Sequence, residues 1–471
     1  MLFSFLKYIS PTWYYNISSE ESSVNHFFLD YRSLNESQQK LLDISDCYRN
    51  YESVLCDAAY QINKKGLFLP KAEPLAVEPQ EKRSVTIKLF GERTMDIHRD
   101  VCITDVIDNY CFVKRFFSSS HLVRIFVRRV LTLHNPINEV RGLLKARKVK
   151  RINVFAQNGY EGYRKDYEAF ESALIEDNPK VSVIIPTLNR YEYLKDVMAD
   201  LEKQDYKNFE VIVVDQTEPF NEEFYKGWNL DLHVYHQEEK ALWLARNLAI
   251  KRAVGKYILL YDDDSRVDPD WICQHLKCLD FFKCDISSGV SLSVVGARIP
   301  EDYAYFKWSD QIDTGNVLFA KNMMHDTGMF DRQFEKQRQG DGEYGLRAYL
   351  CGKTNISNPF AKRIHLKVAQ GGLRQMGSWD GLRPKKLFAP RPIPSVIYLS
   401  RKYFGNSIAR LFQWDSVSVS LLPYKYKGKR WAPILSSLLF ILCFPVVGVQ
   451  MAISWRQAGN KLKEGDKIEL L

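Results

Sequence analysis

The chain has 471 residues, of which 45% are hydrophobic and 13% aromatic. This length exceeds that of an ordinary single domain, so we expect two or three domains, and the apolar content excludes a mainly disordered chain. Lysine and arginine number 66 against 57 aspartates and glutamates, a formal net charge of +9. This small excess is compatible with an anionic substrate or an anionic membrane surface, and we expect no nucleic-acid partner.

The nine cysteines are odd in number and scattered, which indicates a reducing compartment and no disulfide framework. Cys273, Cys278 and Cys284 cluster with His275, but their spacing is not that of a zinc module. We interpret them as residues of one helix and of the segment that follows it.

Residues 1–175 form an N-terminal α+β region whose sequence indicates no function. Residues 33–62 carry apolar residues at helical spacing, with Asn35 as a possible cap. Residues 68–84 contain three prolines and several charges, which predicts a linker. The stretch from there to Phe116 looks rich in strands. Residues 121–134 predict a basic amphipathic helix, whose basic face is either simply solvated or a binding surface.

From Lys180 onward the pattern changes to apolar runs separated by helical segments. The runs "VSVIIPT", "FEVIVVD", "HVYHQ" and "KYILLYDDD" alternate with the helical stretches "YEYLKDVMADLEKQDY" and "KALWLARNLAIKRAVG". This order predicts an α/β domain with mostly parallel strands and crossover helices, and continuous apolar runs fit strands that are buried on both faces.

Three of these strands end in polar residues. In such sheets, ligands bind beyond the carboxyl ends of the strands, so Thr187, Asp215 and the triplet Asp262 to Asp264 should converge on one crevice. Carboxylates at this edge lie outside the apolar core, where Mg²⁺ or Mn²⁺ can neutralise them together with substrate phosphates. The pair Asp262 and Asp264 could therefore hold a metal ion and a nucleotide diphosphate.

Five motifs together resemble those of family 2 glycosyltransferases with a GT-A fold. They are "VSVIIPTLNR", "FEVIVVDQT", "ALWLARNLAI", "GKYILLYDDDSRVDPDW" and "GDGEYGLRAYLCG", and they cover residues 180–374. The resemblance implies transfer of a sugar from a nucleotide sugar to an acceptor hydroxyl with inversion at the anomeric carbon, and we expect the donor to be UDP-linked.

The resemblance also implies roles for individual residues on the donor side. Metal binding falls to Asp264, with Mn²⁺ or Mg²⁺ as the cofactor, and Asp262 lies nearer the ribose. The other residues expected to bind the nucleotide sugar are Pro186, Thr187, Asn189, Asp215, Arg246 and Asp263. Where the family often has a second aspartate after Asp215, this chain has Gln216, which leaves the base of the nucleotide open. Arg246 has a surface salt bridge as its alternative role.

The same resemblance assigns the acceptor side to residues 313–353. The family opens its catalytic helix with a Glu-Asp pair, which here aligns with Gly340 and Asp341. Asp341 is the expected catalytic base, with Glu343 as the reserve and helix capping as the alternative role of Asp341. His365 stands where related enzymes place a histidine, sometimes on the metal, although a structural role remains open. Residues 370–381 are glycine-rich and could form a lid.

The segment 432–454 carries no charge and is about long enough to span a bilayer. Trp431 and Trp455 flank it like interfacial anchors, and four basic residues precede it. It either spans the membrane or lies in it as a hairpin, which predicts attachment to the cytoplasmic face. We expect a glycosyltransferase domain at 179–385, a basic helical extension at 386–430 and a membrane-associated segment at 431–455.

The Gln-x-x-Arg-Trp motif of processive polysaccharide synthases is absent, so the sequence favours transfer of a single sugar to a glycan or a lipid-linked glycan, as in cell-surface polysaccharide biosynthesis. Two alternatives share the nucleotide-binding half. A nucleotidyltransferase usually has a glycine-rich basic loop after the first strand, which "PTLNRYEYL" does not provide. A non-catalytic nucleotide-sugar-binding protein would not need the acidic residues that this chain carries.

Overall fold

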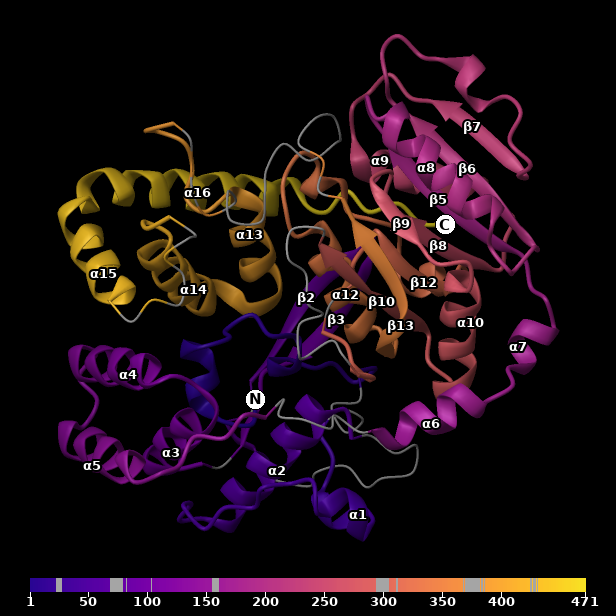
Figure 1. Ribbon diagram of the computed structural model, residues 1–471. Coiled ribbons are helices and arrows are strands. Elements are labelled where there is room, and N and C mark those ends of the chain that lie inside the picture. Colours follow the sequence, from indigo (N-terminus) through magenta and orange to yellow (C-terminus); the bar gives the residue numbers. More distant parts are fainter. Residues whose placement is uncertain are drawn as a thin grey trace. The chain divides into compact units, whose positions relative to one another are not determined.

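The computed structural model describes residues 1–22, 28–67, 79–81, 83–102, 104–154, 161–293, 305–310, 312–366, 368, 382, 384, 386–423, 426, 429 and 431–471. The chain divides into two compact units, whose elements are labelled in Figure 1. Unit 1 comprises Met1–Lys88, Thr94–Gln157 and Gly377–Gly465, and unit 2 comprises Leu89–Arg93, Asn158–Met376 and Asp466–Leu471. The N-terminal region and the C-terminal helices thus belong to one unit, an association for which the sequence pattern holds no sign.

Unit 2 is built on a nine-stranded mixed sheet with the order β11-β13-β10-β12-β8-β5-β6-β7, in which β9 pairs with β13. The strands are β5 (Val181–Thr187), β6 (Phe209–Asp215), β7 (Leu232–His236), β8 (Tyr257–Tyr261), β9 (Ser265–Val267), β10 (Ile286–Ser293), β11 (Lys307–Trp308), β12 (Asn316–Ala320) and β13 (Asn355–His365). The helices are α6 (Glu161–Ala169), α7 (Ala173–Glu176), α8 (Tyr191–Glu202), α9 (Leu242–Arg252), α10 (Trp271–Phe282), α11 (Met323–Thr327) and α12 (Gly340–Leu350).

The four strands that the apolar runs predict form the parallel half of this sheet. β5 pairs in parallel with both β6 and β8, and β6 pairs in parallel with β7. Every residue of β5, β6 and β8 is buried, as continuous apolar runs predict. The other half departs from the expectation of a mostly parallel sheet, because β12 runs antiparallel to both β8 and β10.

The last residues of the chain return to unit 2. The backbone N–H of Met329 donates to the carbonyl of Glu469 over 2.9 Å, and the N–H of Lys467 donates to Asp331 Oδ1 over 2.9 Å. Residues 466–471 therefore complete the packing around residues 328–331, although 431–465 lie in unit 1.

Unit 1 contains mainly helices and two small sheets. The helices are α1 (Glu36–Gln39), α2 (Tyr51–Lys65), α3 (Val106–Phe116), α4 (Ser119–Leu131), α5 (Pro136–Arg147), α13 (Pro394–Leu399), α14 (Gly405–Val419), α15 (Ala432–Leu442) and α16 (Phe444–Glu464), with a π-helical turn at Ser400–Phe404. The strands are β1 (Pro79–Glu81) paired with β4 (Val101–Cys102), and β2 (Ser84–Phe90) paired with β3 (Arg93–His98); the connected ends of β2 and β3, Leu89–Arg93, belong to unit 2.

Three N-terminal expectations need correction. The stretch up to Phe116 is strand-rich only as far as Cys102, because Asp105 caps α3 by accepting a hydrogen bond from the N–H of Asp108 over 2.7 Å. The helix expected over 33–62 is two helices, the first of which has a complete capping box at Asn35. Within the linker expected over 68–84, residues 79–81 form a strand instead, whereas 68–78 and 82 lie outside the described residues.

The uncharged C-terminal segment forms two helices rather than one. α15 and α16 meet at Cys443 with a bend of 84°. Within the described part of the chain, no single helix is long and apolar enough to cross a membrane, and this bent pair is the one candidate by length and composition.

Candidate functional site

The ends of β5, β6 and β8 meet at one edge of the sheet, as the sequence predicts. Thr187 at the end of β5 lies in register with Asp215 at the end of β6. The Thr187 hydroxyl also donates to Asp263 Oδ2 over 2.8 Å, which joins β5 to the acidic turn after β8. The polar residues predicted at these strand ends therefore belong to one site.

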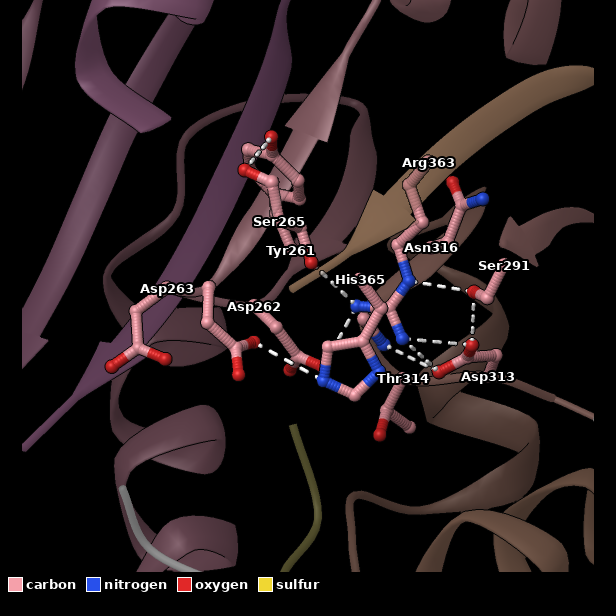
Figure 2. A network of polar contacts seen from close by, with 12 residues as sticks. Tyr261, Asp262, Asp263, Ser265, Ser291, Asp313, Thr314, Asn316, Arg363 and His365 are labelled. Carbon is pink, nitrogen blue, oxygen red and sulfur yellow. Dashed lines mark hydrogen bonds and ion pairs between the residues drawn. The ribbon is translucent and has the colours of Figure 1, made fainter. Parts of the chain in front are cut away.

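Two buried arginines hold the carboxylate of Asp262. Arg246 Nη2 lies 3.1 Å from Asp262 Oδ1, and Arg363 Nη1 lies 2.8 Å from Oδ2. Arg363 also binds Asp313 through Nη2 and Ser291 through Nε, so it links β8, β10, β13 and the loop before β12 (Figure 2). Both oxygens of Asp262 are thereby fixed in orientation.

Gly315 provides the space that this ion pair needs. A Cβ at residue 315 would lie 2.1 Å from Arg363 Nη1 and 2.2 Å from Asp262 Oδ2. Contacts this short are not tolerated, so a larger residue at 315 would separate Arg363 from Asp262. Gly315 thus contributes to the site by having no side chain.

A third arginine, Arg190, binds the other two acids of the triplet. Its Nη1 lies 2.8 Å from Asp263 Oδ1 and 3.1 Å from Asp264 Oδ2. Burial raises the pKa of Asp263 to about 6, against the opposing charge of Arg190. Burial also acts to raise the pKa of Asp264, but the hydrogen bond from His365 and the charges of His365 and Arg190 outweigh it, so this pKa is lowered. Asp264 is therefore the more readily ionised of the two.

Asp262, Asp264 and His365 form a possible metal site. One potential ligand atom from each residue lies within 4.8 Å of the others, and His365 Nε2 lies 3.3 Å from Asp264 Oδ1. Two carboxylate oxygens and one imidazole nitrogen form a donor set that suits Mn²⁺ and is compatible with Mg²⁺. The residues present thus fit the predicted cofactor.

The residues expected around the nucleotide base lie at the ends of β5 and β6. Asp215 is fully buried and accepts hydrogen bonds from the hydroxyls of Tyr191 over 2.6 Å and Tyr225 over 2.8 Å. Asn189 has a left-handed backbone with φ of 54°, and its N–H donates to Thr217 Oγ1 over 2.8 Å. Pro186 is buried within β5. In this conformation Asp215 fixes two tyrosines and does not face solvent.

The side chain of Gln216, which stands where the resemblance places an aspartate, forms hydrogen bonds to other residues of the protein. Its Oε1 accepts hydrogen bonds from the N–H of Ala241 over 2.7 Å and from Gln237 Nε2 over 3.1 Å. Because Ala241 precedes α9, this contact ties the end of β6 to the start of the helix that carries Arg246.

Arg246 is fully buried in unit 2, so its predicted alternative as a surface salt bridge is wrong. Besides Asp262, its Nη2 donates to the carbonyl of Thr314 over 2.8 Å. Its guanidinium lies over the ring of Trp243 at 5.1 Å from the centroid. Arg246 therefore connects α9 to the acidic turn.

The helix predicted to carry the catalytic base is α12. Asp341 lies in its first turn, is partly exposed, and accepts a hydrogen bond through Oδ1 from the N–H of Gly342 over 2.8 Å. Glu343 is fully buried and binds Arg347 through two bonds of 2.9 Å. This buried ion pair keeps Glu343 away from solvent, so the structure argues against its expected role as the reserve base.

Sequence reasoning overlooked Arg190, Arg363 and Asp313. Arg363 could have been found, because it lies two residues before His365 on the same strand, and alternate residues of a strand point to the same face. Arg190 is the last residue of the first motif, "VSVIIPTLNR", in which the resemblance assigns roles only to Pro186, Thr187 and Asn189. The glycine-rich lid expected at 370–381 lies outside the described residues.

Comparison with known proteins agrees with this geometry. The model of the family "Glycosyl transferase family 2" matches residues 182–330. Glycosyltransferase GlyA of Streptococcus pneumoniae is 26% identical over 201 residues, which are 39% of this chain and 29% of that protein. The poly(ribitol-phosphate) beta-N-acetylglucosaminyltransferase TarS of Staphylococcus aureus is 29% identical over 129 residues, 26% of this chain and 22% of TarS.

These matches span less than a third of the length of either relative. Among solved structures, S. aureus TarS 1–349 in complex with UDP-GlcNAc aligns with 61% of this chain and 92% of that chain, at 16% identity and a TM-score of 0.39. Likeness at that level defines neither substrate nor mechanism. The segment that the family model matches contains β5, β6, β8 and the acidic turn, so the similarity to glycosyl transferase family 2 falls on the part of unit 2 that forms the candidate site.

Proposed function

We propose that unit 2 transfers a single sugar from a nucleotide sugar to a hydroxyl of a glycan or lipid-linked glycan, with inversion at the anomeric carbon. The observation that carries the proposal is the acidic turn after β8, where Asp262 and Asp264 lie inside the region matched by the family model and cluster with His365 at the end of β13. The proposal treats the carboxyl edge of the sheet as the donor site.

UDP-GlcNAc is the first donor to test. TarS is named for the transfer of N-acetylglucosamine, and one of its structures contains UDP-GlcNAc. In this chain, Thr187, Asp263 and Arg190 form a connected polar group where a nucleotide would lie. Arg190 supplies a positive charge beside the two acids, which suits the diphosphate of such a donor.

Asp264, His365 and Asp262 would hold a divalent cation. When bound, the cation stabilises the negative charge that develops on the leaving diphosphate. Arg363 and Arg246 fix Asp262, and Arg190 binds one oxygen of Asp264, so the carboxylates are already oriented. Preoriented groups need little rearrangement when charge develops.

Asp341 is the proposed catalytic base. A sugar hydroxyl is a weak nucleophile, so a carboxylate must take its proton as the new C–O bond forms. Asp341 is partly exposed, and its one side-chain hydrogen bond that the structure shows comes from the neighbouring N–H of Gly342. It is therefore available to a substrate, in contrast to Glu343, which is held in the core.

We also propose that the α15–α16 segment attaches the protein to the cytoplasmic face of a membrane. The bend of 84° favours a hairpin lying in one leaflet over a single straight span. All six residues from Ile441 to Val446 are exposed, and none is charged. An exposed apolar tip of this kind suits the acyl region of a bilayer.

An assay that measures both products tests the transfer. The full chain is incubated with UDP-GlcNAc, Mn²⁺ and a panel of glycan and lipid-linked acceptors, and release of UDP and transfer of the sugar are followed together. Equal molar amounts of UDP and of transferred sugar support the proposal. Reaction with UDP-linked hexoses other than GlcNAc would change only the identity of the donor sugar.

Two other outcomes identify the alternative functions. Formation of a nucleotide sugar from UTP and a sugar phosphate would identify a nucleotidyltransferase. Tight binding of the nucleotide sugar without turnover would identify a binding protein.

A further inference from the structure

Unit 1 exposes a second apolar corner besides the tip of α15–α16. This corner joins α4 to α5, and its most exposed side chains are Leu131 at 76%, Leu133 at 94% and Ile137 at 61%. Most of the large apolar side chains that are exposed anywhere in the described residues lie on α4–α5 or between Trp414 and Val449. Such a concentration marks an interaction surface.

The α4–α5 corner is ordered and does not result from a disordered loop. The N–H of Leu133 donates to the carbonyl of Val130 over 3.1 Å, the N–H of His134 donates to that of Arg129 over 3.0 Å, and Asn135 caps α5. Leu133 has a φ of 61°, in the left-handed region that usually carries glycine at the end of a helix. A leucine here is unfavourable for the backbone and gains no packing within the chain, so its apolar side chain needs another explanation.

The apolar residues form stripes that the helices leave uncovered. On α4, Leu122 and Ile125 are buried, whereas Val123, Val127 and Leu131 recur every four residues on an exposed face. On α5, a comparable exposed stripe contains Ile137, Val140 and Leu144. These two helices thus have apolar surface on the outside as well as on the inside, which is not the pattern of an ordinary solvated amphipathic helix.

The charges beside these stripes are positive. Between Ser119 and Arg151 the chain has a single acidic residue, Glu139, and it is buried in a two-bond ion pair with Arg129. The exposed charged residues of this stretch are Arg141, Lys145, Arg147, Lys148, Lys150 and Arg151. An apolar surface with a cationic border is complementary to an anionic lipid bilayer.

The two apolar corners belong to one continuous part of unit 1. Arg128 of α4 forms an ion pair of 2.7 Å with Asp415 of α14. The neighbouring residue, Trp414, stacks on Phe444 at the tip of α15–α16, with ring centroids 5.7 Å apart. Figure 1 draws the α4–α5 corner and the α15–α16 corner toward the same side of this unit, at the left of the view.

We propose that the α4–α5 corner and the α15–α16 tip together form one membrane-binding face, which enters a single leaflet of an anionic bilayer while the flanking arginines and lysines contact the lipid headgroups. This extends the proposed attachment through residues 431–455, and it does not depend on the sugar that unit 2 transfers. It predicts a protein that lies on the membrane surface through two separate insertions.

Flotation with lipid vesicles tests the proposal. The full chain carrying Leu131→Ser, Leu133→Ser and Ile137→Ser is compared with the unaltered chain on vesicles of phosphatidylcholine and phosphatidylglycerol. We expect the partition coefficient to fall by about 100-fold or more, because three apolar side chains no longer enter the lipid. Val254→Ser is the matched control, since Val254 is 70% exposed in unit 2, and it should leave flotation unchanged.

A second variant isolates the charges. Arg141→Gln, Lys145→Gln and Arg147→Gln should lower partition into these vesicles by roughly 100-fold and into pure phosphatidylcholine vesicles hardly at all. Equal melting temperatures of the variants and the unaltered chain show that the fold is intact.

Each other outcome contradicts this inference. Flotation that survives the serine triplet but is lost on substitution of the α15–α16 tip leaves only the attachment through 431–455. A chain that is a dimer without lipid, and that the serine triplet converts to a monomer, identifies a second copy as the occupant of the α4–α5 corner. Flotation that survives both the serine triplet and substitution of the α15–α16 tip, or no flotation of the unaltered chain, rejects both insertions.

Discussion

Gly340 at the start of α12 packs directly against Trp243 of α9. A Cβ at residue 340 would lie 2.3 Å from Cζ2 of Trp243, so the helix with the proposed base approaches the ring on which Arg246 lies. The resemblance described above aligns the glutamate of a Glu-Asp pair with Gly340, and here the indole of Trp243 occupies the space that a side chain at residue 340 would need. The contact joins the acceptor side of the proposed site to the donor side.

Gly340→Ala should therefore disturb both sides of the site. The added methyl group must displace Trp243, at a cost of about 1–3 kcal/mol in the free energy of unfolding. Arg246 should then hold Asp262 less well. We therefore expect the KM for the nucleotide sugar to rise and kcat to fall. Thermal unfolding and steady-state kinetics measure the two effects.

Trp243→Phe provides the matched control for this contact. The smaller ring lacks the atoms that the new methyl group would meet, so the double variant should recover most of the stability that Gly340→Ala loses. If the stability losses of the two single variants instead add up in the double variant, Trp243 and Gly340 are not coupled.

Asp264→Asn should abolish metal-dependent binding of UDP. It removes one charge from the cluster of Asp264, Asp262 and His365 while keeping the shape of the side chain. Calorimetry with UDP in the presence and absence of Mn²⁺ measures the effect, and excess chelator should abolish turnover of the unaltered protein. Asp231→Asn is the control, because Asp231 belongs to a different acidic group with Glu210 and His233. Full activity in chelator would contradict the metal role.

Asp341→Asn should lower kcat by the ~10²–10⁴ typical of losing a general base. The amide keeps the size of the side chain and can still accept the hydrogen bond from Gly342, so the fold should be unchanged. Affinity for UDP and Mn²⁺ should also be unchanged, since the proposed role of Asp341 is on the acceptor side. A large loss of UDP affinity would mean that Asp341 belongs to the donor site.

Glu343→Gln should act mainly on stability. The substitution leaves Arg347 in the core without its carboxylate partner, and breaking a buried ion pair in this way costs about 3–5 kcal/mol. Denaturant unfolding should show this loss, whereas kcat per folded molecule should change little. A decrease of kcat comparable with that of Asp341→Asn, without loss of stability, would restore Glu343 as a candidate base.

The sequence was most informative where function requires polar residues at the ends of buried strands. The runs before Thr187, Asp215 and Asp262 are recognisable because polar or charged residues follow apolar ones abruptly. Arg363 and Asp313 were harder to find, because they meet Asp262 only through strand pairings that join distant segments. Unit 1 was not predictable for the same reason, since its helices come from both ends of the chain.

The α15–α16 tip should enter lipid, and point substitutions test this better than deletion of the C-terminal segment. Deletion from Trp431 onward would also remove residues 466–471, which pack in unit 2, and would uncover Val417, whose neighbours Val447 and Met451 lie on α16. Loss of membrane binding in such a truncation could therefore reflect misfolding.

Cys443 allows a direct measurement on the otherwise unaltered chain. It lies at the bend between α15 and α16, and it is the exposed one among nine free cysteines. An environment-sensitive fluorophore on Cys443 should shift to shorter wavelength and brighten when vesicles of phosphatidylcholine and phosphatidylglycerol are added, because the tip moves from water into the acyl region. Ile441→Ser with Leu442→Ser should abolish the shift, since these side chains are 69% and 76% exposed and supply the apolar surface of the tip. An unchanged spectrum of the labelled chain in the presence of vesicles that it binds would show that the tip stays in water and that attachment lies elsewhere.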